Sequence, residues 1–186
     1  MMLGPMWTKL INFGLFQAGW FACVLGAAFG QVWLGTGLGV VFVMTHLALV
    51  PNRAGEMRLL IFALCVGLVV DSVHMRTGAL VFFEGNVFPG LAPPWILVLW
   101  MQIASTLRFS LSWLEGRYVF GCFLGACCGV LAYAAGVRLG AAGFGTDSTR
   151  ALLQIGFGWG LALPFLLLVA RRISRGHETE RYQIFW

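Results

Sequence analysis

The sequence predicts an all-α integral membrane protein, a helical bundle of about six transmembrane helices with cytoplasmic N- and C-termini. Three observations support this fold class. Apolar residues make up 60% of the 186 residues and charged residues only 10%, far below the roughly 25% that is usual in soluble domains. Apolar stretches long enough to cross a bilayer recur along the whole chain. Lys and Arg residues gather in alternate connections between these stretches, as they do in membrane proteins.

Six apolar segments have the length of a spanning helix, which requires roughly 20 mostly apolar residues. Breakers separate them, at 51–55 and at 115–117, and Pro93 with Pro94 suits the first turn of a helix. The predicted spans cover residues 10–29, 32–50, 57–76, 94–114, 118–136 and 151–170. We therefore expect one transmembrane domain over residues 1–170 and a short basic and aromatic cytoplasmic tail over residues 171–186.

The basic residues at the span ends predict the orientation. A cytoplasmic N-terminus places eight Lys and Arg residues inside and three outside, in agreement with the positive-inside rule. The inside set is Lys9, Arg53, Arg58, Arg117, Arg171, Arg172, Arg175 and Arg181, and the outside set is Arg76, Arg138 and Arg150. The net charge of +5 is thus explained by topology, so we expect contact with membrane lipids and no nucleic-acid partner.

Small residues on the fifth span predict close helix packing. Gly121, Gly125 and Gly129 form a GxxxGxxxG stripe, which lets another backbone approach closely. The stripe is expected to pack inside the bundle, and a protein partner or a homodimer is its alternative use. The segment 78–93 is apolar but broken by glycine and proline, so a re-entrant or interfacial hairpin on the outer face is expected there.

Polar side chains within the spans are the candidate functional residues, because a charge at the bilayer centre costs about 2.5 to 3.5 kcal/mol on insertion scales. Asp71, His74 and Arg108 are the candidate catalytic residues, with a structural ion pair or hydrogen-bonded hub as the alternative. A long Arg108 side chain is expected to pair with Asp71. The candidate binding residues share the same depths in neighbouring spans or lie next to them, and they are Gln17, Trp20, His46, Gln102, Thr106 and Ser110.

Depth along the helices divides most of these residues into two polar layers, at a rise of about 1.5 Å per residue. The predicted inner layer holds Gln17, His46, Thr106 and Arg108. The predicted outer layer holds Asp71, His74 and Gln102, with Gln154 as a possible addition. No HExxH, GxSxG or Walker motif occurs, and the five cysteines lack CxxC spacing, so neither a metal site nor a cofactor is expected.

Short motifs spread over nearly the whole chain resemble a bacterial inner-membrane family of unknown function, domain of unknown function 2878. They comprise Asn12-Phe13, residues 16–21, Leu25-Gly26, Gly67, Asp71-Ser72, Pro93-Pro94-Trp95, Leu99-Trp100, Thr106-Leu107, residues 110–114 and residues 133–140. The resemblance implies a compact multispanning protein without an assigned activity, located in the bacterial inner (cytoplasmic) membrane. It also implies a link to lipid modification.

Three functions remain open from the sequence. The first is a membrane-embedded enzyme or accessory protein that acts on lipid or another apolar substrate, with Asp71 and His74 as acid and base. The second is a small transporter or channel, although no internal repeat supports it. The third is a non-catalytic scaffold or assembly partner, for which the glycine stripe and the short loops are suited.

Overall fold

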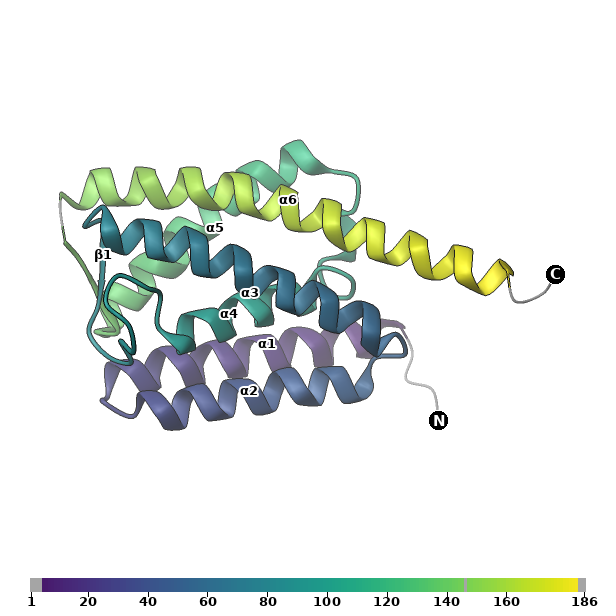
Figure 1. Ribbon diagram of the computed structural model, residues 1–186, viewed down its shortest axis with the longest axis horizontal. Helices are drawn as coiled ribbons and strands as arrows, with labels where there is room; N and C mark the ends of the chain where they lie inside the picture. The colour runs from purple at the N-terminus through teal and green to yellow at the C-terminus, as the bar shows by residue number, and fades with distance from the viewer. Residues whose placement is uncertain (1–4, 146, 184–186) are drawn as a thin grey trace.

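The computed structural model describes residues 5–145 and 147–183, with side chains described for 6–145 and 147–174. Six α-helices dominate this part of the chain, together with two short strands and one 3-10 turn (Figure 1). The elements are α1 (Pro5–Ala28), α2 (Val32–Leu49), α3 (Arg53–Arg76), β1 (Leu80–Phe82), α4 (Pro94–Thr106), η1 (Ser112–Leu114), α5 (Tyr118–Leu139), β2 (Ala142–Phe144) and α6 (Ser148–Gln183).

The helices form one bundle in which α3 and α4 lie between the α1–α2 pair and the α5–α6 pair (Figure 1). The start of α1 and the end of α6 lie at the same end of the bundle, which we call the terminal end. The opposite end carries β1 and β2, which pair with each other, and we call this pair the clasp.

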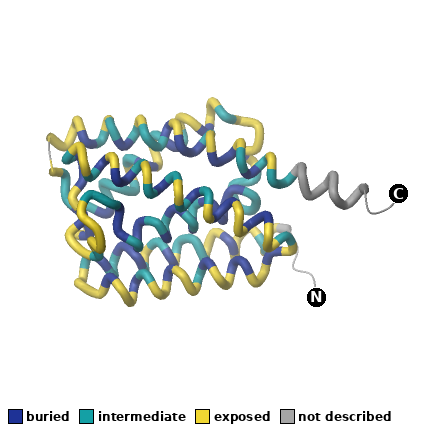
Figure 2. Tube along the Cα trace, in the orientation of Figure 1, coloured by how far each residue is buried: buried dark blue, intermediate teal, exposed yellow. Residues whose placement is uncertain are grey.

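Five helices are long and apolar enough to cross a membrane: α1, α2, α3, α5 and the part of α6 up to Ser174. Large apolar side chains cover the outside of the bundle, among them Phe123 (67% exposed) and Phe157 (71% exposed). Figure 2 shows exposed positions recurring along the outer faces of the helices. Such a surface requires lipid as its solvent, so the chain is a multipass helical membrane protein, as the sequence predicted.

The fourth predicted span, 94–114, is only partly a regular helix. The helix α4 has 13 residues and ends at Thr106, so its length of about 20 Å is less than the roughly 30 Å of a bilayer core. Tight turns and η1 continue the chain, and the backbone carbonyl of Thr106 accepts hydrogen bonds from the amides of Phe109 and Leu111. The turns are half-buried for the most part. Their polar side chains bond to α1, α3 and α6, and irregular backbone that packs against protein is tolerated at membrane depth.

Two other boundaries differ from the prediction for identifiable reasons. Helix α3 begins four residues early, because the side chain of Asn52 caps it by accepting a hydrogen bond from the Gly55 amide at 2.9 Å. Helix α6 does not end near residue 170 but continues to Gln183, so residues 171–183 of the predicted tail are helical. The side chains of 175–183 and all of 184–186 lie outside the described residues.

The segment 78–93 is not a separate hairpin. Its strand β1 pairs antiparallel with β2, which follows α5, in the register Leu80–Phe144, Val81–Gly143 and Phe82–Ala142. The clasp therefore ties the connection after α3 to the connection after α5. A strand pairing between segments about sixty residues apart could not be read from the local pattern of either one.

The glycine stripe of α5 packs against α6 of the same chain. A Cβ atom added to Gly125 would overlap the backbone carbonyl oxygen of Trp159, and one added to Gly129 would overlap the Trp159 side chain. A Cβ on Gly121 would stand 2.8 Å from Leu167. The stripe thus packs against α6 inside the bundle, which is the first of its two predicted uses.

We expect the substitution Gly125→Ala to lower the free energy of unfolding by about 1–3 kcal/mol, because the new methyl group meets backbone that cannot rotate away. Gly14→Ala is the control, since a Cβ at Gly14 meets nothing within 4 Å and alanine favours the helix. Equilibrium unfolding in mixed micelles of increasing dodecyl sulfate content measures both. Equal stability of the two variants would contradict the packing role of Gly125.

Candidate functional site

A large apolar cavity lies between α1, α4, α5 and α6 and is called the groove below. Its volume is about 350 Å³, within the range of small-molecule sites. The groove is lined by Phe13, Phe16, Trp20, Val24, Phe82, Trp95, Ile96, Leu99, Trp100, Ile103, Leu111, Trp113, Leu124, Gly125, Cys128, Gly129, Ala132, Tyr133, Gly136, Ala142, Trp159 and Leu163. Nearly all of these side chains are apolar or aromatic, so the groove suits an apolar ligand.

The groove reaches the lipid-facing surface between α1 and α5. Phe13 (49% exposed) and Trp113 (45% exposed) line it from one side, and the exposed Cys128 lines it from α5. The wall deeper in the bundle is buried, with Trp95 at 2% and Trp100 at 1% exposure. The groove is therefore a lateral opening at membrane depth that leads to a protected interior.

Stacked aromatic rings form the deep wall of the groove. The rings of Trp100 and Trp159 stack at a centroid distance of 4.3 Å, and Tyr133 meets Trp159 edge-on at 6.4 Å. Two glycines give these rings their space, because a Cβ on Gly67 or on Gly129 would overlap Trp100 or Trp159. The wall thus depends on aromatic side chains from α4, α5 and α6 and on the space that Gly67 leaves on α3.

Asp71 lies directly behind this wall and is fully buried. Its Oδ2 accepts a hydrogen bond from Trp100 Nε1 at 2.6 Å, and its Oδ1 accepts one from the Tyr133 hydroxyl at 2.5 Å. Both donors are neutral and both belong to residues that line the groove. The carboxylate of α3 therefore fixes the two rings of α4 and α5 in one orientation.

The predicted pairing of Asp71 with Arg108 is wrong. Asp71 bonds to Trp100 and Tyr133, while Arg108 donates from Nη1 to Glu56 Oε2 at 3.0 Å and from Nε to Ser174 Oγ at 3.1 Å. The predicted depths of the two residues differ by roughly 11 Å. Each of them has closer partners at its own depth, so the long arginine side chain does not need to cross that gap.

His74 lies one helical turn beyond Asp71, but it bonds to α6. Its Nδ1 lies 3.0 Å from Gln154 Nε2, which also donates to the Thr77 hydroxyl at 2.8 Å. Its Nε2 is buried, lacks a hydrogen-bond partner in the described part of the chain, and faces Gly158. His74 and Gln154 therefore join α3 to α6 as the predicted outer layer suggested.

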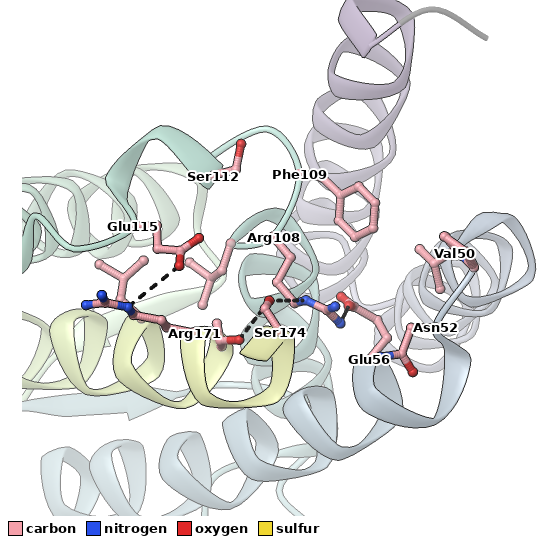
Figure 3. A pocket seen from close by; sticks show the side chains of 13 residues that line it. Val50, Asn52, Glu56, Arg108, Phe109, Ser112, Glu115, Arg171 and Ser174 are labelled. Carbon is pink, nitrogen blue, oxygen red and sulfur yellow. Dashed lines mark hydrogen bonds and ion pairs between the residues drawn. The ribbon is translucent and has the colours of Figure 1, made fainter. Parts of the chain in front are cut away.

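A second polar centre lies at the terminal end, around the fully buried carboxylate of Glu56 (Figure 3). Glu56 Oε1 lies 2.9 Å from His46 Nε2, and Oε2 accepts the hydrogen bond from Arg108. Arg108 also holds Ser174 of α6. One carboxylate from α3 thus joins α2, the turns after α4 and, through Arg108, α6.

Asn12 of α1 extends this centre. Its Oδ1 accepts hydrogen bonds from the hydroxyl of Ser110 at 2.7 Å and from the Ser110 amide at 3.2 Å. Its Nδ2 donates to the carbonyl of Ser105 at 3.0 Å and lies 3.3 Å from His46 Nδ1. The terminal-end network, defined as Asn12, His46, Glu56, Arg108 and Ser174, thus connects α1, α2, α3, α6 and the turns after α4.

A smaller cavity of about 230 Å³ lies beside this network and contains Arg108 and Glu56 in its lining. Arg171 and Glu115 form a second and looser ion pair there, at 3.8 Å, with Glu115 half exposed (Figure 3). Figure 3 shows the two guanidinium groups apart from each other, each beside its own carboxylate. The positive charges in this cavity are therefore already paired.

Comparison with protein families supports the resemblance seen in the sequence. The profile described as Protein of unknown function (DUF2878) matches residues 9–165, which include the groove and Asp71. The chain belongs to this family. No curated protein and no solved structure gives a significant match.

Of the six predicted binding residues, the structure places one in the groove and two at the terminal-end network. Trp20 lines the groove, His46 contacts Glu56, and Ser110 bonds to Asn12. The other three lie elsewhere. Gln102 donates to the Gly39 carbonyl at 3.3 Å, Thr106 bonds to its own helix at Ile103, and Gln17 is half-buried on α1 and lines neither cavity.

Sequence reasoning missed Glu56, Asn12, Trp100 and Tyr133. Glu56 stands one residue before the predicted third span and was therefore assigned to a connection. The other three occur in motifs that carry the family resemblance, and this was the signal available for them.

Proposed function

We propose that this DUF2878 protein binds the hydrocarbon chain of a membrane lipid, or of a similarly apolar substrate, in the groove. It would act there as a membrane-embedded enzyme or as an accessory protein for lipid chemistry. The groove itself carries this proposal, since it combines an apolar lining, a lateral opening at membrane depth and a buried interior of stacked aromatic rings.

The surroundings of the groove support hydrocarbon as its occupant. Water is scarce at this depth in a bilayer, and the lining offers few polar groups that could hold it. Acyl chains, in contrast, surround the exposed rim at Phe13 and Trp113. A chain that enters gains close contacts with the aromatic wall, and dispersion contacts of this kind are individually small but add up.

Within this proposal Asp71 is a positioning residue. Trp100 and Tyr133 line the groove, whereas Asp71 lies behind them and acts through its hydrogen bonds to both. His74 likewise acts on the packing of α3 against α6. Arg108 belongs to the terminal-end network, so we assign it to the assembly of the helices that frame the groove.

We also propose that the protein lies in the bacterial cytoplasmic membrane with its terminal end facing the cytoplasm. The support is the location of Arg53, Arg117 and Arg171 at that end, next to the α2–α3 and α4–α5 connections.

Single cysteines at Asn52 and Asn86 in a cysteine-free chain are expected to react with an impermeant maleimide from opposite sides of the membrane. Labelling of Asn52→Cys in intact cells would contradict this orientation.

Photolabelling in native membranes tests the binding function. A fatty acid with a diazirine near its methyl end, fed to cells and incorporated into lipids, is expected to crosslink preferentially to groove residues such as Trp20 and Ala132. The comparison is with outward-facing residues, Phe123 and Phe157, which contact bulk lipid. Equal labelling of both sets, together with an unchanged lipid profile in a strain lacking the protein, would contradict the proposal.

A further inference from the structure

The groove is elongated along the helices. On α1 its lining recurs at helical spacing from Phe13 to Val24, which at 1.5 Å per residue is a length of roughly 17 Å. On α5 the lining runs from Leu124 to Gly136, a length of about 18 Å. Both lengths are close to half of a bilayer core of about 30 Å, which is the depth of the hydrocarbon chains in one leaflet.

The two ends of the groove differ. At the clasp end it is bounded by Phe82 and Ala142, which are opposed partners in the β1–β2 pairing and are both buried. At the other end it is bounded by Phe13 and Trp113, which are half-exposed. The backbone pairing of the clasp makes the first of these boundaries a fixed one, whereas the second opens toward lipid.

We propose that the groove holds a single extended hydrocarbon chain, of about one leaflet in length, and that the clasp sets the longest chain it accepts. This inference rests on the function proposed above and adds the substrate class, a lipid recognised through one long linear or prenyl chain. Phe82, Ala142 and Gly136 are then the residues that determine chain length.

Gly136 offers a direct test of this inference. It is the groove residue of α5 nearest to the clasp, and a Cβ built on it meets nothing within 4 Å. A larger side chain at this position therefore extends into empty space and shortens the groove. Gly14 has equally open surroundings but lies on α1 outside the groove lining, so Gly14→Leu is a matched control for Gly136→Leu.

The experiment uses the full-length protein in detergent micelles. An alkyl diazirine probe labels the groove, and saturated fatty acid methyl esters from octanoate to eicosanoate compete with it, compared at equal mole fraction in the micelle. Because the micelle is as apolar as the groove, preference comes from packing and not from transfer out of water. We expect competition to strengthen with chain length and then to level off once a chain reaches the clasp.

In Gly136→Leu the levelling off is expected at a shorter chain, and the longest esters should compete about tenfold more weakly, a change of about 1.4 kcal/mol. Gly14→Leu should reproduce the wild-type series. Gly136→Ala should shift the series in the same direction by less, and it preserves the test if the leucine variant does not fold.

The outcomes separate this inference from the function on which it rests. If probe labelling maps to the groove and is competed, but all long esters compete alike in wild type and in both Gly136 variants, the clasp does not set chain length and only the further inference fails. If the probe does not label the groove, or if no ester competes, the proposed binding function fails with it.

Discussion

Replacing Glu56 by glutamine is expected to lower the free energy of unfolding by roughly 3–5 kcal/mol. The buried carboxylate of Glu56 holds His46 and Arg108 at once. Glutamine keeps the shape but removes the negative charge, so the largely buried guanidinium of Arg108 is left without its counter-ion. Breaking a buried pair from one side is far more costly than removing an exposed one.

Equilibrium unfolding in dodecyl sulfate mixed micelles measures this loss, with Glu115→Gln as the control. Glu115 also pairs with an arginine, but it is half exposed and 3.8 Å away, so its replacement should change stability by less than about 1 kcal/mol. The double variant Glu56→Gln with Arg108→Met should cost much less than the sum of the two single changes. Additive costs would show that Glu56 and Arg108 are not coupled.

The helical bundle could be predicted from the sequence because hydropathy and length alone decide which segments enter a bilayer. The spans 32–50 and 118–136 differ from α2 and α5 by only a few residues. The prediction failed where local hydropathy does not decide the structure. Residues 107–114 are apolar enough to extend a helix, yet they form turns whose polar groups bond to Asn12, Glu56 and Ser174.

The sequence predicted how deep each candidate side chain lies in the membrane, but it did not predict which other side chain it bonds to. Depth along a helix follows from counting residues, and on this basis His46 and Arg108 were correctly placed in one layer, where both contact Glu56. Which side chains meet also depends on the rotation of each helix about its axis. Small residues decide which faces can meet. Because Gly67 has no side chain, Trp100 can pack against the side of α3 that carries Asp71. No such contact can be derived from one span alone.

Removing the carboxylate of Asp71 is expected to loosen the aromatic wall of the groove. In Asp71→Ala, Trp100 Nε1 and the Tyr133 hydroxyl both lose their acceptor in a buried site, at a cost of roughly 1–3 kcal/mol for each group. Asp71→Asn should cost less, because the amide oxygen still accepts from Trp100 and the Tyr133 hydroxyl can rotate to accept from the amide nitrogen. Unfolding in mixed micelles gives stability, and groove labelling by the alkyl diazirine probe should fall in Asp71→Ala.

A second substitution distinguishes this arrangement from a general loss of packing. Tyr133→Phe should destabilise the wild-type protein, because it removes a hydrogen bond to Asp71. In the Asp71→Ala background the same change should be neutral or stabilising, since it removes a hydroxyl that no longer has its partner. If Tyr133→Phe has the same cost in both backgrounds, the hydroxyl does not depend on Asp71. The carboxylate would then have no part in holding the wall against which the lipid chain is proposed to lie.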